Sequence, residues 1–516
     1  MLSSVNVVAE TYSSNRCSLP IKSGETVYLI GAGGCGMSAL GHILLDLGCR
    51  VAGSDICQNK NTEQLIHRGA KIFIGHSAEN IKSINPALVV YTSAIGSDNP
   101  ELRAASSTGT IPLFRRGEFL ATVVNQTDLV CVAGMHGKTT TSALLAYAFE
   151  SLGCSYGYSV GWNVPQLPRN GKFNLPGFSS QQQNSRTGRK TAYFVIEADE
   201  SDGTLNLFEP LHSIILNIDR EHLDYFGSFE RLKREFLNFA EKTRGTLVYC
   251  ADDPILAKMI GKSEKSHSYG FSESAEYKIE LIGENPSKKG FTFEVHKHGK
   301  SLGRFTNALF GAHNVLNSSA AIALLDLIGF SYKEISPIIG SFKGAERRQE
   351  ELLNEKIRVF DDYGHHPNEI RATINAIKPL CSNKLLVVFQ PHRYTRTRDL
   401  YVEFGKCFSG ANRVWVMDIY GAGEKPIPGI TSKLIVDEIL KNGIESESVS
   451  NVDEVCKKVL EKVAVGDVVL FCGAGADVTV AAHRFAEIVC SKRTRSDGTP
   501  DCDKPSDRRL RNLILV

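Results

Sequence analysis

The chain has 516 residues, of which 42% are hydrophobic and 22% are charged, and its formal net charge is +2 at pH 7. This length exceeds what one hydrophobic core supports, so we expect about three domains. The nearly neutral charge argues against nucleic acid or an anionic membrane surface as the main partner. No apolar run reaches the roughly 18 residues of a membrane-spanning helix. The thirteen cysteines include no C-x-x-C pair, which favours a reducing compartment and a cytoplasmic location.

Short β-branched runs such as "TVYLIGAGG", "DLVCVAGM" and "DVVLFCGAG" alternate with helical stretches along the whole chain. Continuous apolar strands of this kind are typical of buried parallel sheets. We therefore predict an α/β protein with three domains, at residues 24–122, 123–340 and 341–491. We expect disordered tails at 1–23 and 492–516, and a surface loop or insertion at 171–190, which is rich in Gln, Ser and Gly.

The first predicted domain begins with a strand that runs into a G-x-G-x-x-G motif at Gly31, Gly33 and Gly36. Asp55 follows about 20 residues later, as in the dinucleotide-binding fingerprint. An NAD-dependent oxidoreductase is therefore one interpretation. The same glycine turn and helix N-terminus can instead hold the diphosphate of a UDP-sugar.

A second glycine loop, "GMHGKTT" at residues 134–140, follows the predicted strand "DLVCVA". Backbone N–H groups and the helix dipole face an anion in such a loop. Lys138 adds a positive charge for phosphates, and a threonine hydroxyl can bind Mg²⁺. The loop is shorter than the full P-loop pattern, which would place a glycine at Val132. We predict an ATP site here, with Mg²⁺ as its metal and Mn²⁺ as an alternative.

Acidic residues crowd the end of the strand in "YFVIEADESDG", and His222 follows the next strand. Mg²⁺ prefers one or two carboxylates together with phosphate oxygens, so this cluster favours a magnesium role. The alternative is a solvated acidic turn. The acidic residues are Glu197, Asp199, Glu200 and Asp202.

The third predicted domain contains two further polar strand ends, "VFDDYGHHPNEI" and "FQPHRYTRTRDL". The first holds two histidines, for which metal binding is an alternative that we do not prefer. The second holds three arginines, a cluster that suits an anion. Pairing with Asp399 and Glu403 in the first turn of a helix is a fair alternative for Arg398, and a weaker one for the other two arginines.

Four segments, "GMHGKTTT", "EADESDG", "NIDREHLDYFGSF" and "GAHNVLNSSAAIA", together resemble the ATP-dependent Mur ligases, which join amino acids to the peptidoglycan precursor. The resemblance runs from about residue 26 to 480. It implies a Rossmann-like UDP-binding domain, a central P-loop ATPase-type domain with a parallel sheet, and a C-terminal Rossmann-like α/β domain that binds the amino acid.

The activity that the resemblance implies is ATP-dependent joining of L-alanine to the lactyl carboxylate of UDP-N-acetylmuramate through an acyl phosphate. A ligase that adds a tripeptide to the same UDP-sugar is the nearest alternative. The implied partners are these small molecules, with neither nucleic acid nor membrane, and the chain is expected to be a monomer or a weak dimer.

The resemblance also assigns roles to individual residues. Catalytic roles fall on Lys138, His222 and Arg348. Metal ligands are Thr139, Glu197 and His222, with Glu200 as the alternative to Glu197. ATP is assigned to Gly134, Met135, His136, Gly137, Lys138, Thr139, Thr140, His313, Asn314, Asn317, Arg348 and Asp362. The UDP-sugar is assigned to Gly31, Gly33, Gly34, Gly36, Met37, Asp55, Thr92, Ser93 and Arg115. L-Alanine is assigned to Tyr363, His365, Arg393 and Arg396.

Two of these assignments carry a reservation that the sequence itself raises. The resemblance assigns His313, Asn314 and Asn317 to the adenine base of ATP. These residues stand where a helix would begin, so an N-cap role competes with the adenine role. Met135 stands where the family commonly has threonine, which removes one hydroxyl but leaves the backbone loop intact.

Overall fold

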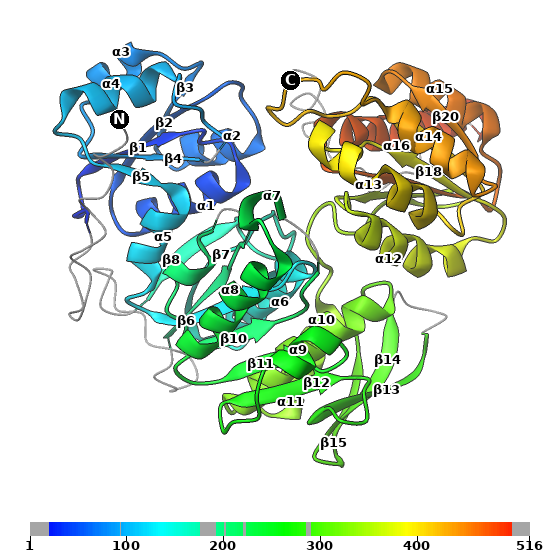
Figure 1. The fold of residues 1–516 in the computed structure, drawn as a ribbon, viewed down its shortest axis with the longest axis horizontal. Coiled ribbons are helices and arrows are strands. Elements are labelled where there is room, and N and C mark those ends of the chain that lie inside the picture. Colours follow the sequence, from blue (N-terminus) through cyan, green and yellow to red (C-terminus); the bar gives the residue numbers. More distant parts are fainter. Residues whose placement is uncertain are drawn as a thin grey trace.

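The computed structural model describes residues 20–92, 94–175, 192–200, 203–219, 223–284 and 290–497. It contains three α/β units in chain order, each built on its own sheet, with the first and third standing above the second in the view of Figure 1. The predicted α/β fold class is confirmed. Among the described residues, no helix is both long and apolar enough to span a bilayer.

The N-terminal unit is a five-stranded sheet in the order β3-β2-β1-β4-β5, and all four strand pairs are parallel. The order reverses between β1 and β4, and ligands of such sheets bind at the carboxyl ends of the strands beside that switch. The strands are β1 Thr26–Ile30, β2 Arg50–Asp55, β3 Lys71–Ile74, β4 Leu88–Tyr91 and β5 Leu113–Arg115. The helices are α1 Cys35–Asp46, α2 Lys60–His67, α3 Ala78–Ile84, α4 Pro100–Thr108 and α5 Arg116–Val124.

The middle unit is a ten-stranded sheet in the order β15-β14-β13-β12-β11-β10-β6-β9-β7-β8. The strands from β13 through β7 pair in parallel, whereas β8 and the β13-β14-β15 hairpins pair antiparallel. The strands are β6 Asp128–Ala133, β7 Ser155–Ser159, β8 Gly171–Asn174, β9 Ala192–Glu197, β10 His212–Ile215, β11 Leu247–Cys250, β12 Ser266–Gly270, β13 Tyr277–Glu284, β14 Phe291–Lys297 and β15 Lys300–Thr306. The helices are α6 Lys138–Ser151, α7 Leu223–Phe226, α8 Phe229–Lys242, α9 Pro254–Met259, α10 Ala312–Leu327 and α11 Tyr332–Ser341, with a 3₁₀ turn at Leu205–Leu207.

The C-terminal unit is a six-stranded sheet in the order β16-β17-β21-β18-β19-β20, parallel except for β16. The strands are β16 Glu350–Asn354, β17 Arg358–Asp362, β18 Leu385–Phe389, β19 Arg413–Met417, β20 Glu445–Val449 and β21 Val468–Cys472. The helices are α12 Pro367–Ile377, α13 Tyr394–Cys407, α14 Ser432–Lys441, α15 Val452–Lys462 and α16 Ala476–Asp497, with a 3₁₀ turn at Lys378–Leu380.

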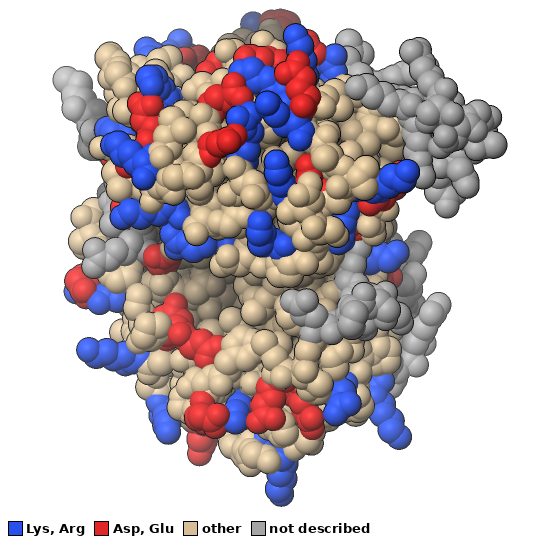
Figure 2. Space-filling model, turned by 90° about the vertical axis from the view of Figure 1, so that its right-hand side faces the viewer, with Lys and Arg blue, Asp and Glu red and all other residues tan. Residues whose placement is uncertain are grey.

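The N-terminal and middle units share one hydrophobic core, whereas the C-terminal unit has its own. One continuous hydrophobic cluster runs through the N-terminal and middle units, from Leu29 on β1 to Leu145 on α6. The C-terminal sheet instead has a separate cluster on each face, because alternate residues of β18 such as Leu385 and Leu386 point to opposite sides. The C-terminal unit therefore has cores of its own, one of which Phe310 joins from the end of the middle unit. Charges of both signs are interspersed over the face drawn in Figure 2.

The segment at 171–190 differs from the prediction of a loop, because its first residues form strand β8 against β7. A β-carbon on Gly171 would lie 2.2 Å from the backbone oxygen of Ala39, so this glycine permits α1 to pack directly on β8. A four-residue strand followed by a polar run carries too little periodicity to be recognised in the sequence. Residues 176–191 lie outside the described part of the chain.

The predicted domain limits also differ from the elements at three points. Helix α5 crosses the limit between residues 122 and 123. Ile21, placed in the predicted tail, is 4% exposed and joins the core. Helix α16 continues to Asp497, six residues into the other predicted tail. The charged end of a helix and a loop have similar compositions, so the sequence did not reveal that α16 extends this far.

Candidate active site

The middle unit's glycine loop lies between β6 and α6, and two of its residues need to be glycine. Gly134 and Gly137 have φ values of 134° and 83°, which L side chains rarely adopt. A β-carbon on Gly137 would lie 2.4 Å from Asn317 Oδ1, and one on Gly134 would lie 3.0 Å from Leu216 Cβ. Gly137 is also the N-cap of α6, so the orphan N–H groups of that helix open into this loop.

Lys138, the first residue of α6, folds back over the loop. Its Nζ donates to both carboxylate oxygens of Glu200 at 2.9 Å and to the carbonyl oxygen of Gly134 at 2.6 Å. Burial opposes the charge of Lys138, but the neighbouring acidic groups Glu200, Asp199 and Glu197 together outweigh it and raise the pKa. Lys138 is therefore held as an ammonium group at the mouth of a helix N-terminus.

The structure separates the two glutamates that the sequence left as alternatives. Thr139 Oγ1 donates to Glu197 Oε1 at 2.9 Å, and the Gly161 N–H donates to Glu197 Oε2 at 2.9 Å. Glu200 is 1% exposed and pairs with Lys138. Glu197 is thus the carboxylate beside the loop threonine. His222 and Asp202 lie outside the described residues, so the histidine's place in the metal set stays a prediction.

Asn217, which follows β10, clamps the loop from the neighbouring strand. Its Oδ1 accepts from the backbone N–H of His136 at 2.8 Å, and its Nδ2 donates to the carbonyl oxygen of His136 at 3.0 Å. The Met135 N–H donates to the Asn217 carbonyl at 3.3 Å, while the Met135 side chain is 6% exposed within the core. Sequence reasoning missed Asn217. Its position at a strand end was the available signal.

A cavity of about 270 Å³ lies between the middle and C-terminal units. It brings together most of the residues assigned to ATP, including loop residues, one face of α10 and the start of the C-terminal unit. The assigned residues that line it are His136, Gly137, Thr140, His313, Asn314, Asn317, Arg348 and Asp362. Leu216, Cys250, Tyr269, Leu309 and Leu316 give it an apolar side, which suits a base beside a polar phosphate end.

Hydrogen bonds and short side-chain contacts position the residues assigned to adenine. Helix α10 is capped by Gly311, so the alternative of an asparagine N-cap is wrong. Asn314 Nδ2 donates to the Phe310 carbonyl at 2.8 Å and lies 3.2 Å from His313 Nε2. Gln349 Nε2 also lies 3.2 Å from that nitrogen, a partner that the sequence did not indicate. Burial lowers the pKa of His313 to about 4, so the ring is neutral near pH 7.

Glu369, the third residue of α12, organises the C-terminal wall of the cavity. Its Oε2 accepts from the backbone N–H groups of His365 and His366 at 3.0 and 3.1 Å, and its Oε1 lies 3.6 Å from Arg348 Nη1. Asp362 accepts from the N–H groups of Gln349 and Gly364 at 2.8 Å each. Asp362 thus shapes two backbone turns beside the cavity. Glu369 was missed because it reads as an ordinary helix residue.

Three of the four residues assigned to L-alanine form a chain of contacts. The Tyr363 and His365 rings are 5.3 Å apart, and His365 is 5.3 Å from the ring of His392, a residue missed from sequence. His392 Nδ1 lies 3.0 Å from Arg396 Nη1. Arg393 is the N-cap of α13 at a φ of 71°, with its N–H donated to Tyr420.

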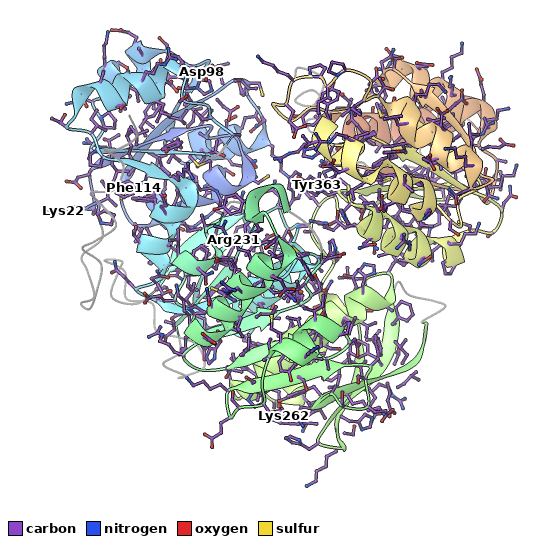
Figure 3. All side chains as sticks on the ribbon, viewed as in Figure 1. Lys22, Asp98, Phe114, Arg231, Lys262 and Tyr363 are labelled. Atoms are coloured by element: carbon purple, nitrogen blue, oxygen red, sulfur yellow. The ribbon has the colours of Figure 1, made fainter. Side chains whose placement is uncertain are left out.

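Tyr363 lies where the three units approach one another (Figure 3). Its ring is 5.2 Å from that of Trp162 in the middle unit and 5.2 Å from the Arg348 guanidinium. Arg398 pairs with Asp399 at 2.7 Å on the surface, in agreement with the ion-pair interpretation for that arginine. Arg398 is therefore separate from the chain of contacts around Tyr363.

The N-terminal unit's glycine loop is closed by an acidic side chain. Asp55 Oδ2 accepts from the Gly33 N–H at 2.7 Å. A β-carbon on Gly33 would lie 2.6 Å from Asn59 Nδ2, and Asn61 Nδ2 donates to the Gly33 carbonyl at 2.8 Å. Both asparagines were missed, although they begin helix α2 directly after the "SDICQ" turn.

The other residues assigned to the UDP-sugar lie in this loop, at the start of α1 or at the ends of β4 and β5. Gly31 adopts a φ of 86°, and a β-carbon there would lie 2.9 Å from Thr92 Cγ2. Gly34 is the N-cap of α1, Met37 is buried, and Gly36 packs against the Arg116 side chain. Arg115 ends β5, where a hydrogen bond with the Tyr91 side chain raises its pKa. Ser93 lies outside the described residues.

Comparison with known protein families covers each unit in turn. Residues 26–127 match the model "Mur ligase family, catalytic domain", residues 132–325 match "Mur ligase middle domain", and residues 345–475 match "Mur ligase, glutamate ligase domain". The UDP-N-acetylmuramate–L-alanine ligase of Carboxydothermus hydrogenoformans is 37% identical over 469 residues, which cover 90% of this chain and 97% of that protein. The enzyme of the same name from Aquifex aeolicus is 38% identical over 453 residues, covering 87% and 94%.

Solved structures give the same relationship. The UDP-N-acetylmuramate-alanine ligase MurC from Thermotoga maritima superposes with a TM-score of 0.76 at 28% identity, covering 91% of this chain and all of that one. A murein peptide ligase from Psychrobacter arcticus shares the fold with a TM-score of 0.67 at 23% identity, covering 90% of this chain and 98% of that one. The three family models and the relatives that match nearly the whole chain show that it belongs to the Mur ligase family.

Proposed function

We propose that this chain is an ATP-dependent ligase that joins L-alanine to the lactyl carboxylate of UDP-N-acetylmuramate and releases ADP and phosphate. The observation that carries the proposal is the cavity between the middle and C-terminal units. One wall presents His136 and Gly137 of the glycine loop, directly before Lys138, and the other presents Arg348, which lies close to Tyr363. The identity of 37% with the Carboxydothermus relative, over nearly the full length of both chains, supports L-alanine as the amino acid.

A carboxylate is a poor acyl donor, so the reaction needs an oxygen turned into a leaving group. In the proposed sequence, a lactyl carboxylate oxygen attacks the γ-phosphorus of ATP, ADP leaves, and an acyl phosphate forms. The amine of L-alanine then attacks the acyl carbon, loses a proton and expels phosphate. Phosphoryl transfer leaves a protein mainly positioning and charge neutralisation to perform, and these are the roles proposed for Lys138 and Arg348.

The donor set beside the loop fits magnesium. Thr139 and Glu197 place a hydroxyl and a carboxylate oxygen 2.9 Å apart, and hard oxygen donors of this kind suit Mg²⁺. We propose these two residues, with His222, as the ligands. The ion, when bound with ATP, would neutralise charge on the phosphates. Mn²⁺ takes similar ligands.

The amino acid must present its amine while its carboxylate is held. Guanidinium groups bind carboxylates in a bidentate manner, so we assign the carboxylate of L-alanine to Arg393 and Arg396. The His365 and His392 rings lie between Arg396 and Tyr363. They supply a surface for the small side chain.

An ADP-release assay with UDP-N-acetylmuramate and a panel of L-alanine, glycine, L-serine and a tripeptide tests this proposal. We expect ADP release that depends on the UDP-sugar and is fastest with L-alanine. Release with the tripeptide alone would favour a ligase that recycles peptides, and oxidation of reduced nicotinamide would favour the oxidoreductase interpretation. Amino-acid-dependent ADP formation would also exclude a binding protein without activity.

A further inference from the structure

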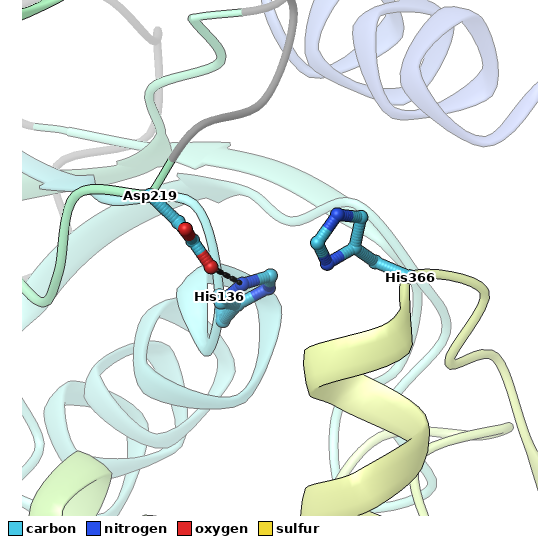
Figure 4. A group of neighbouring side chains, drawn as sticks. All are labelled: His136, Asp219 and His366. Atoms are coloured by element: carbon cyan, nitrogen blue, oxygen red, sulfur yellow. Dashed lines mark ion pairs between the residues drawn. The ribbon is translucent and has the colours of Figure 1, made fainter. Parts of the chain in front are cut away.

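Three side chains from distant parts of the sequence meet at the boundary between the middle and C-terminal units. His136 belongs to the glycine loop after β6, Asp219 follows β10, and His366 is the N-cap of α12. One ligand atom from each lies within 4.8 Å of the other two. Figure 4 shows the ring of His366 turned toward the pair formed by His136 and Asp219. None of the roles assigned above uses this group as a set.

The spacing of the group is close to that of a tetrahedral metal site. Bonds of about 2.0–2.1 Å from a metal to imidazole nitrogen, and slightly longer ones to carboxylate oxygen, place neighbouring ligands roughly 3.4 Å apart. His136 Nε2 and Asp219 Oδ2 are already 3.6 Å apart. The ligand atoms of all three side chains lie within 4.8 Å of one another, so a shift of at most roughly 1.4 Å would bring the third ligand to the spacing of a tetrahedral site.

The surroundings orient these side chains as supporting carboxylates and amides do in metal sites. A histidine ligand usually turns its second ring nitrogen toward a carboxylate or carbonyl. The second nitrogen of His136, Nδ1, lies 3.6 Å from Glu369 Oε1. Asn368 Nδ2 hydrogen-bonds to Asp219 Oδ2 from the C-terminal side. The backbone of His136 is fixed by Asn217 on both its N–H and its carbonyl.

We propose that His136, Asp219 and His366 form a binding site for a divalent transition-metal ion such as Zn²⁺ or Co²⁺. Two imidazoles and one carboxylate favour these ions over Mg²⁺, which prefers oxygen ligands. The site is distinct from the Thr139 and Glu197 pair proposed for the ATP-linked Mg²⁺. Two of its ligands belong to the middle unit and one to the C-terminal unit, so an ion bound there ties the two walls of the cavity together.

Co²⁺ is the probe for the test, because four-coordinate Co²⁺ absorbs visible light. We expect the full-length protein, freed of metal by chelator, to bind one Co²⁺ per chain in the presence of millimolar Mg²⁺, and Zn²⁺ to displace it. Calorimetry and the visible spectrum measure this binding. Small-angle scattering should show a more compact particle with Co²⁺ than without it.

The variant His366→Asn removes a ligand while leaving folding intact, because asparagine is a good helix N-cap and replaces the cap that His366 gives to Asn368. We expect it to weaken Co²⁺ binding by at least about tenfold, as the loss of metal-site partners generally does. Glu369→Gln removes the negative charge behind His136, while the amide oxygen can still accept from the N–H groups of His365 and His366. We expect it to weaken Co²⁺ binding by about 10- to 100-fold.

His267→Asn is the matched control, because His267 on β12 forms a histidine–carboxylate pair with Glu276 at 2.9 Å outside the proposed site. We expect this variant to bind Co²⁺ as the unmodified chain does. Loss of binding in His267→Asn, unchanged binding in His366→Asn, or displacement of Co²⁺ by millimolar Mg²⁺ would each overturn the proposal. None of these outcomes depends on which amino acid the enzyme joins to the UDP-sugar, so this proposal can fail without the proposed function failing.

Discussion

The two glycine loops of this chain have the same place between a strand and a helix, but they hold side chains of opposite charge. Each follows a buried parallel strand and opens a helix whose N-cap is a glycine, Gly34 or Gly137. In the N-terminal loop the carboxylate of Asp55 accepts from the Gly33 N–H. In the middle loop the ammonium of Lys138 lies over the Gly134 carbonyl.

This difference shows that a glycine loop by itself sets only the capacity to approach an anion. Asp55 satisfies one of the loop's own donors and fixes its shape. Arg116 packs against Gly36 at this helix end, but the loop itself has no basic side chain that folds back over it as Lys138 does. Lys138 adds a charge that acts most strongly on a group whose charge grows during reaction. The first loop is therefore suited to binding and the second to chemistry, a contrast that substitutions can test.

The largest effect should come from Lys138→Ala in the second loop. Loss of the ammonium removes stabilisation that is greater in the transition state than in bound ATP, so turnover should fall by about 10²-fold or more. Steady-state rates of ADP release measure this. Near-normal turnover with weaker ATP binding alone would contradict the chemical role of this loop.

The same substitution leaves the buried Glu200 without its cation. Removing one partner of a buried ion pair typically costs about 3–5 kcal/mol of folding free energy, so a fall in activity alone is ambiguous. The double variant Lys138→Met with Glu200→Gln removes both charges and should restore stability without restoring turnover. Recovery of turnover in that variant would mean that Lys138 acts through folding.

Substitutions at the C-terminal arginines, which lie outside both glycine loops, should not change how either loop binds its ligand. Arg393→Ala or Arg396→Ala should raise the Michaelis constant for L-alanine by about ten- to a hundredfold, because a charged hydrogen bond contributes roughly 1.5–3 kcal/mol. The constants for ATP and the UDP-sugar should change little. Arg398→Ala is the matched control, since Arg398 pairs with Asp399 on the surface of the same helix.

If both arginine variants kept normal saturation by L-alanine while binding of the UDP-sugar collapsed, these arginines would belong to the other substrate. The comparison between Arg393 and Arg396 is also informative by itself. Arg396 contacts His392, whereas Arg393 is an N-cap with positive φ. A larger effect at Arg396 would place the alanine carboxylate on the side of the His365 and His392 rings.

In the first loop, Asp55→Ala should weaken UDP-sugar binding by roughly tenfold, because one charge-assisted hydrogen bond that shapes the loop is worth at least about 1.5 kcal/mol. The ATP constant should not change. Glu79→Ala is the control, since Glu79 is an exposed acid of the same unit that pairs with Lys82. An unchanged UDP-sugar constant in Asp55→Ala would show that the loop keeps its shape without this carboxylate.

The sequence revealed both loops because glycine, lysine and acidic residues at strand ends are local patterns. It did not reveal Asn217, whose importance depends on β10 lying beside β6 in the sheet. Its side chain reaches His136 across 81 positions of sequence, and strand order is not a local property. The sequence order of the strands alone would not have predicted that pair.

Residues of the C-terminal wall were missed for a related reason. Glu369 reads as one more acid near a helix start. The fold of the C-terminal unit places it 3.6 Å from Arg348, and the approach of that unit to the middle unit places it 3.6 Å from His136. Strand β8 was missed because its alternation lasts four residues. In each case the feature depends on tertiary contacts that the sequence does not display, whereas the residues that carry a local sequence pattern were identified.

The smallest effect should come from Met135→Thr, which restores the hydroxyl that the family commonly has in the second loop. The Met135 side chain is 6% exposed and belongs to the core, so it faces away from the anion that the loop's N–H groups would bind. We expect the Michaelis constant for ATP to change by no more than one neutral hydrogen bond allows, about 0.5–1.5 kcal/mol.

The free energy of unfolding should fall by more, roughly 2 kcal/mol, because a buried side chain becomes smaller and more polar. Thermal unfolding and ATP saturation measured on the same preparation separate the two effects. A hundredfold change in the ATP constant would show that position 135 contacts the nucleotide, and the second loop would then owe its chemistry to more than Lys138.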